Sequence, residues 1–149
     1  MDLDFIKSQS DAIKTLQTIT KAIPFTLEGR YIAKITDVYD GDTCKAAIVG
    51  IMQTNIPYEF RIRMLLYNAE EIKQSTKLDE ETRVKLHNIA LLQKQKLSEL
   101  IQDQIVIIDC KKFDAFGRLL SFVYLLNNQV SINDQMIQAF PDIKRIPFE

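Results

Sequence analysis

Two aspartates separated by one glycine form the first of three clusters in this sequence whose residue types could do chemistry. The run Asp40-Gly41-Asp42-Thr43 stands at the end of an expected strand, and its carboxylate oxygens suit a hard divalent cation. Asp-Gly is also a common turn dipeptide, so the cluster taken alone is better explained as a solvated turn. Whether this cluster binds a cation depends on which other side chains the fold brings close to it.

The second cluster begins with two arginines, Arg61 and Arg63, and ends with two glutamates, Glu70 and Glu71. Alternate residues of a strand point to the same side, so the two arginines are expected to share one face. A guanidinium matches the oxygens of a phosphate, and Glu71 can serve as a general base toward water. An exposed strand face that runs into a charged loop would account for the same residues.

The third cluster, Asp114-Ala115-Phe116-Gly117-Arg118, places another arginine just past a turn. By itself it is better explained as a turn with an exposed cation. Together, the three clusters supply a metal-binding carboxylate, two phosphate-binding arginines and a base. Hydrolysis of a phosphodiester needs these parts, because cations stabilise the charge that builds on the phosphoryl oxygens while a base activates water.

The order and spacing of the clusters resemble the staphylococcal nuclease (thermonuclease) family. The family pattern is an Asp-Gly-Asp-Thr turn, an Arg-led strand ending in Asp-(Thr/Ala)-Pro-Glu, and an Asp-x-(Tyr/Phe)-Gly-Arg turn. Here the three parts are residues 40–43, 63–71 and 114–118, and the resemblance covers roughly residues 30–140. Three motifs in this order, separated by matching elements, are far more specific than any one of them.

The resemblance implies calcium as cofactor and assigns it ligands. The calcium-binding positions fall on Asp42, on its acidic neighbour Asp40, on Asn68 and on Ala69, the last through its backbone carbonyl. Asn68 departs from the family, which has a second calcium-binding aspartate there. An amide oxygen carries no charge, so calcium should bind more weakly than in the family.

The resemblance also assigns the catalytic positions. Arg63 and Arg118 would bind the phosphate, and Glu71 would be the general base. Phe116 and Arg61 are assigned to substrate binding, since an aromatic ring can stack on a base. An alignment on Arg61 as the first clamp is the alternative, and the alignment on Arg63 recovers more of the pattern.

Periodicity predicts the elements that must carry these residues. Strands are expected over residues 30–40, 43–51, 58–67, 105–111 and 118–126, and helices over residues 2–23, 78–101 and 132–140. Three strands, a helix and two strands suit an α+β fold built on a five-stranded Greek-key barrel of the oligonucleotide-binding (OB) type. The longest helix is expected to bury Val84, Ile89, Leu92, Leu97 and Leu100.

The chain is expected to divide into two parts. Residues 1–29 would form an amphipathic helical extension that packs on the barrel, and residues 30–149 a staphylococcal-nuclease-like OB-fold domain with flanking helices. The extension is additional to the resemblance. It could instead be a surface for dimerisation or for a partner.

Composition limits the function classes. Lys and Arg number 19 against 20 Asp and Glu, so attraction to nucleic acid must come from a local patch and not from the whole-molecule field. The chain shows no basic apolar leader and no run as long as a membrane span, so a cytoplasmic protein that does not enter membranes is expected. Two cysteines are too few for a disulfide framework, and a single histidine, His87, argues against a zinc site.

The sequence therefore predicts a calcium-dependent nuclease that hydrolyses DNA or RNA, with single strands preferred. The alternative is a weakened or inactive nuclease-like domain that binds nucleic acid or a protein partner, which Asn68 and the near-neutral charge favour. A monomer is expected, and a dimer through the N-terminal helix is the alternative state.

Overall fold

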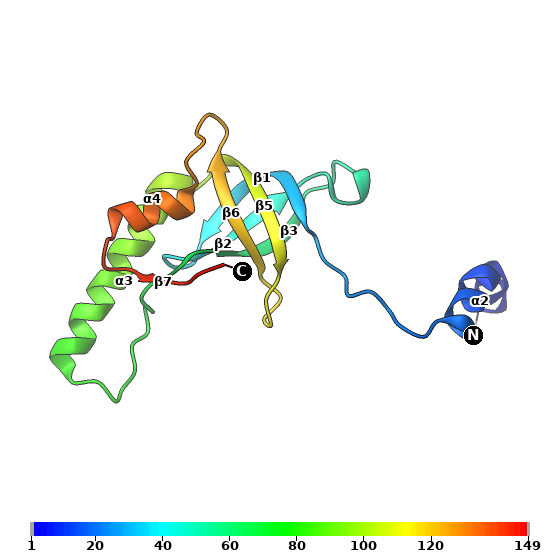
Figure 1. Ribbon diagram of the computed structural model, residues 1–149, viewed down its shortest axis with the longest axis horizontal. Helices are drawn as coiled ribbons and strands as arrows, with labels where there is room; N and C mark the ends of the chain where they lie inside the picture. The colour runs from blue at the N-terminus through cyan, green and yellow to red at the C-terminus, as the bar shows by residue number, and fades with distance from the viewer. Residues whose placement is uncertain (1, 149) are drawn as a thin grey trace.

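A closed five-stranded barrel forms the centre of the computed structural model, which describes residues 2–148. Its strands follow the order β1-β2-β3-β6-β5 around the barrel (Figure 1). All neighbouring strands are antiparallel except β3 and β6, which are parallel. This mixed barrel with flanking helices confirms the α+β class and is consistent with an OB-type fold. The strands are β1 (Gly29–Val38), β2 (Thr43–Ile48), β3 (Tyr58–Met64), β5 (Ile105–Phe113) and β6 (Leu119–Leu125).

Alternation of small or branched apolar residues builds the barrel interior. In β5, for example, Val106, Ile108 and Cys110 are buried while the residues between them are more exposed. This period of two is the pattern that the sequence predicted for a strand with one face in a core. The barrel begins at Gly29, one residue before the expected boundary, and Leu27 just ahead of it is already buried.

Two helices and two short strands complete the domain. The helices α3 (Glu80–Ile101) and α4 (Ile132–Ala139) lie together on one side of the barrel (Figure 1). Each begins at a side-chain cap: Asp79 accepts from the Thr82 N–H at 3.3 Å, and Ser131 accepts from the Asp134 N–H at 3.0 Å. The strands β4 (Tyr67–Asn68) and β7 (Lys144–Arg145) pair with each other, and η1 (Ile51–Gln53) is a single 3-10 turn.

The buried face of α3 agrees with the predicted one only in part. Leu97 is buried and Leu100 packs against the core as expected, but Val84 and Leu92 are 52% and 57% exposed. The residues that α3 buries are Ala90, Gln93, Leu97 and Ile101. The burial of the polar Gln93, which lies beside the Gly41 turn, was not expected.

Asn133 at the start of α4 has a structural role. Its side chain is fully buried. The amide oxygen accepts from the Val123 N–H at 2.9 Å, and the amide nitrogen donates to the carbonyls of Leu65 and Ser121 at 3.0 Å each. One side chain thus satisfies backbone groups of both β6 and the segment after β3, where the two parallel strands lie side by side.

The N-terminal segment forms two short helices, α1 (Leu3–Ser8) and α2 (Ser10–Thr18), and not one helix to residue 23. None of the residues in the two helices is buried, and they stand apart from the barrel (Figure 1), in contrast to the packed helix expected. In the segment that connects them to the barrel, Phe25 stacks on Phe113 with ring centroids 6.2 Å apart.

No helix in the described part of the chain, residues 2–148, is both long and apolar enough to cross a membrane.

Candidate functional site

The three polar clusters of the sequence meet at one cavity of about 590 Å³. Every residue predicted for the site lines it except Ala69 and Phe116. The lining combines the ends of β1 and β2, the outer side of β3 and the loop after β4. It consists of Asp37, Tyr39, Asp40, Asp42, Thr43, Cys44, Lys45, Arg61, Arg63, Asn68, Glu71 and Arg118.

The turn between β1 and β2 is held in place by close packing. The Asp42 N–H donates to Asp40 Oδ1 at 3.0 Å, and the Tyr67 hydroxyl donates to the Gly41 carbonyl at 2.7 Å. A Cβ at Gly41 would lie 2.7 Å from the Cβ of Ala69 and 2.8 Å from that of Gln93. Only glycine fits here, and the two aspartates are therefore fixed against the loop after β4 and against α3.

Asp42 is a buried carboxylate, and burial disfavours its negative charge. Its oxygens accept from the Ala69 N–H at 2.8 Å and from the Thr43 hydroxyl at 3.1 Å. Burial raises the pKa of Asp42 to about 6; Arg63 opposes the rise and the charge of Asp40 adds to it. A second cation beside this carboxylate would therefore be favourable.

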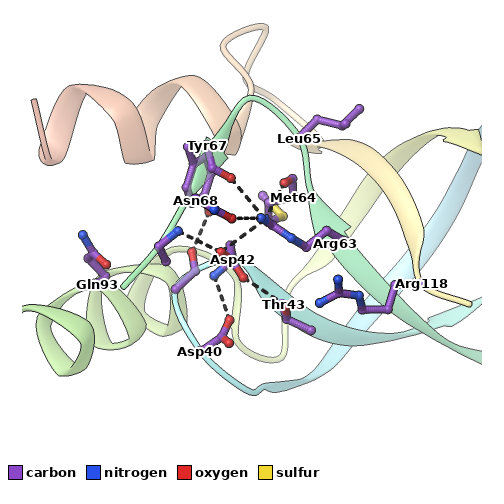
Figure 2. A network of polar contacts seen from close by, with 12 residues as sticks. Asp40, Asp42, Thr43, Arg63, Met64, Leu65, Tyr67, Asn68, Gln93 and Arg118 are labelled. Carbon is purple, nitrogen blue, oxygen red and sulfur yellow. Dashed lines mark hydrogen bonds and ion pairs between the residues drawn. The ribbon is translucent and has the colours of Figure 1, made fainter. Parts of the chain in front are cut away.

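Arg63 lies between two of the predicted metal ligands (Figure 2). Its Nη1 is 3.2 Å from Asp42 Oδ2, and its Nη2 donates to Asn68 Oδ1. Nη1 also donates to the carbonyls of Met64 and Tyr67 at 2.9 and 3.1 Å. The guanidinium is thus an internal counter-ion for Asp42 at the wall of the cavity.

The loop that carries Glu71 is anchored from α3. The side-chain oxygen of the buried Gln93 accepts from the Glu70 N–H at 2.7 Å, and the Glu71 carbonyl accepts from the Gln74 amide. Glu71 itself is exposed and lines the cavity. A carboxylate in this position faces Arg63 and Arg118 across the same space and is accessible to water.

The β5–β6 hairpin presents Arg118 to the cavity. Asp114 Oδ1 accepts from the N–H groups of Phe116 and Arg118 at 2.9 Å each, and Asp114 Oδ2 accepts from Arg118 Nε at 2.7 Å. Burial tends to raise the pKa of Asp114, but these hydrogen bonds outweigh it and hold the pKa below its usual value. Only Nε of the guanidinium is used, so its outer nitrogens remain for a ligand.

Arg61 ties the hairpin to β3. Its Nη2 donates to the Phe116 carbonyl, so the arginine links two walls of the cavity. Phe116 does not line the cavity; its ring is 72% exposed and lies 5.4 Å from Arg118 Cζ. Arg61 therefore has a positioning contact in addition to lining the cavity.

The sequence analysis did not single out Tyr39, Lys45 or Gln93. Tyr39 (69% exposed) and Lys45 line the cavity beside the aspartate turn, and Gln93 makes the hydrogen bond to Glu70 described above. Tyr39 directly precedes the Asp-Gly-Asp turn, which is a signal that could have found it. Gln93 carries a weaker signal, a polar residue within one turn of Ala90 and Leu97.

Oxygen donors at the cavity fit a weakly held hard cation. Asp40 and Asp42 are both buried carboxylates of one turn, and Asn68 adds an amide oxygen. Within residues 2–148, no group of three or more His, Cys, Asp or Glu side chains could hold a metal ion. Ala69 donates its N–H to Asp42, and its carbonyl stays a predicted ligand. A cation here would depend on two carboxylates, one amide, that carbonyl and water.

The thiol that lines the cavity is not a nucleophile. Cys44 is fully buried, and burial raises its pKa to about 12, with the charges of Asp40 and Asp37 adding to the rise. Because the thiolate is the reactive form, a thiol held protonated at neutral pH is inert.

The sequence matches no protein-family model, and no curated protein matches it significantly.

Proposed function

We propose that this protein is a cation-assisted phosphodiesterase that cuts nucleic acid, with the nuclease-like domain and the calcium site that the motifs suggest. The observation that carries the proposal is the convergence of three clusters, remote in sequence, on a single cavity. Packing alone does not require acidic, basic and amide side chains to meet in one cavity. Phosphoryl transfer uses groups of these kinds.

The arginines would bind the phosphate. Arg118 has its outer guanidinium nitrogens available, since Asp114 uses only Nε. Arg63 faces the same cavity and would exchange part of its contact with Asp42 and Asn68 for phosphate oxygens. Planar guanidinium groups on two sides of a phosphate stabilise the charge that develops on its oxygens.

Glu71 would hold and activate the attacking water. It is exposed at the cavity, and its loop is fixed by Gln93 through Glu70. A carboxylate can accept a proton from the attacking water when it is held within hydrogen-bond distance of that water. A divalent cation bound by Asp42, Asp40 and Asn68 would supply Lewis-acid stabilisation of the phosphoryl oxygens.

Two exposed aromatic rings, one at the cavity and one on the hairpin that carries Arg118, favour an unpaired strand as substrate. Tyr39 lies beside the aspartate turn and Phe116 on the hairpin, and both rings are more than two-thirds exposed, at 69% and 72%. Bases stack on such rings without regard to sequence. The proposed substrate is therefore single-stranded DNA or RNA, bound through its phosphates and stacked bases.

A second candidate function is a binding module without catalysis. The contacts of Arg63 favour it, because the guanidinium already neutralises Asp42 and engages the Asn68 oxygen that a cation would need. In this case the cavity would hold a phosphate without cutting its ester.

Cleavage and binding of labelled single-stranded DNA, measured across a calcium titration and with a chelator, separate the two functions. The proposed nuclease cuts with calcium and stops with chelator. Binding that the chelator leaves unchanged, with no cutting in calcium, magnesium or manganese, would establish the binding module instead.

A further inference from the structure

The loop that carries Glu71, residues 69–79, is only partly held by packing. It contains no helix or strand, and it leads away from the barrel before α3 begins (Figure 1). A hollow of about 410 Å³ lies between this loop and the first turns of α3. The position of the loop must therefore depend on hydrogen bonds across the hollow. The hollow is lined by Ile72, Gln74, Glu80, Arg83, Val84 and His87.

Two side chains of α3 hold this loop by its backbone, one on each side of Glu71. Before Glu71, the Glu70 N–H donates to the side-chain oxygen of Gln93 at 2.7 Å. After Glu71, the Ile72 carbonyl lies 2.7 Å from Nδ1 of His87. In the described part of the chain, no other hydrogen bond ties the backbone of these three loop residues to a helix or strand. Glu71 therefore stands between two fixed points.

The bond from His87 is a donated one, and its donor stands on a fixed element. A carbonyl oxygen only accepts, so Nδ1 of His87 carries the proton that is shared with Ile72. The helix α3 is itself held against the core, because Ala90, Leu97 and Ile101 are fully buried. The half-buried ring of His87 thus connects the loop to a part of the molecule that is anchored independently of it.

His87 differs from Gln93 in what else it contacts. Gln93 also lies beside the turn between β1 and β2, where a Cβ at Gly41 would come within 2.8 Å of its own Cβ. A change of Gln93 would therefore disturb the aspartates of that turn as well. His87 does not line the cavity of the candidate site, and the hydrogen bond of its ring goes to the loop. Its role can be tested without altering a proposed cation ligand or phosphate-binding arginine.

We propose that His87 is a positioning residue of the nuclease, which holds the loop so that Glu71 faces Arg63 and Arg118 across the cavity. This inference rests on the proposed function and adds a residue to it. A catalytic group displaced by about 1 Å can lose about 100-fold in rate, so a base on a loop needs such support. The histidine contacts neither the phosphate-binding arginines nor the cation ligands. Its loss should therefore lower kcat and leave KM unchanged.

Cleavage of labelled single-stranded DNA in saturating calcium by the full chain and three variants tests the role. His87→Ala removes the donor and should lower kcat about 10- to 100-fold with KM unchanged. His87→Asn keeps a nitrogen donor at the same place along the side chain and should recover most of the rate. The control is Asn88→Ala, which makes a similar truncation at the exposed neighbouring residue of α3 and should cleave like wild type.

Hydrogen exchange measured by mass spectrometry follows the loop independently of cleavage. Peptides from residues 69–79 should exchange faster in His87→Ala than in wild type, because one of the two fixed points is lost. His87→Asn should restore the exchange rate of wild type. Peptides from β5 should exchange alike in all four proteins, which shows that the barrel is intact in each variant.

Failure of the inference and failure of the proposed function give different results. Equal kcat in wild type and His87→Ala, or a loss of kcat that His87→Asn does not recover, would overturn the role of His87 and leave the nuclease standing. No cleavage by wild type in any cation would remove the proposed function. Loop exchange would then decide about His87 alone, and equal exchange in wild type and His87→Ala would show that the ring does not hold the loop.

Discussion

At the scale of single residues, the buried carboxylate of Asp42 makes the stability of the folded protein depend on pH. Its pKa is raised in the folded protein to about 6 from 3.8, mainly by burial. The folded state therefore binds a proton more readily than the unfolded state. The stabilisation from this proton is complete below the unfolded pKa and is lost as the pH rises through 6.

Asp42→Asn should therefore stabilise the metal-free protein at pH 8, by about 1–3 kcal/mol at 1.4 kcal/mol per pKa unit. The gain should shrink as the pH falls toward 4. Thermal or urea unfolding in chelator at a series of pH values measures it, with the exposed Asp37→Asn as control. A difference that does not change with pH, or a destabilised Asp42→Asn at pH 8, would contradict the burial argument.

Asn68→Asp should strengthen calcium binding, because it adds a carboxylate beside Asp42 and gives Arg63 an ionic partner on that side. One added ligand charge is expected to lower the dissociation constant about tenfold. Titration calorimetry of calcium into both proteins measures the change. Asn88→Asp, an exposed change on α3, controls for net charge. Equal gains in both variants would show that Asn68 is not beside the cation.

At the scale of elements, the contact between the β1–β2 turn and α3 sets the site. Gly41→Ala would place a methyl group 2.7 Å from the Cβ of Ala69 and 2.8 Å from that of Gln93. Overpacking of this kind costs about 1–3 kcal/mol. Urea unfolding should show that loss, and Ala69→Gly in the same chain should recover part of it. Additive losses in the double variant would mean that the two methyl groups do not meet.

The elements also show how far the sequence predicts this structure. The five strands and the long helix follow from local periodicity, and each was found within a few residues of its expected place. The buried face of α3 was predicted only in part: Leu97 is buried as expected, but Gln93 is buried too, beside the Gly41 turn far away in the chain. Periodicity shows which face of a helix is apolar. It does not show which residues will pack against a turn that is distant in sequence, such as the Gly41 turn.

The same limit applies to the site and to the N-terminal segment. The clusters around Asp42, Arg63 and Arg118 were predictable because each is a continuous motif, and the structure brings them to one cavity. The bridge of Arg63 between Asp42 and Asn68 depends on side-chain geometry that no motif contains. Amphipathic spacing over residues 2–23 likewise predicted a helix packed on the barrel, but spacing alone does not say what an apolar face packs on, and neither N-terminal helix buries a residue.

At the scale of the whole molecule, the net charge of -1 limits electrostatic attraction to nucleic acid. Binding should depend on a few local cations, among them Arg61, Arg63, Arg118 and Lys45 at the cavity. For single strands the logarithm of affinity should then fall with the logarithm of salt with a slope of about -1 to -3. Fluorescence anisotropy with Arg118→Ala should give a slope smaller by about 0.7. An unchanged slope would remove Arg118 from the phosphate contacts.

Two adjacent glutamates allow the most direct test of the proposed nuclease. Glu71 lines the cavity, whereas Glu70 does not and only its N–H is used, by Gln93. Cleavage of labelled single-stranded DNA in saturating calcium should be about 100-fold or more slower in Glu71→Gln, the usual scale for loss of a general base, and little changed in Glu70→Gln. Equal rates in wild type and Glu71→Gln, or no cleavage by wild type at any calcium concentration, would contradict the account.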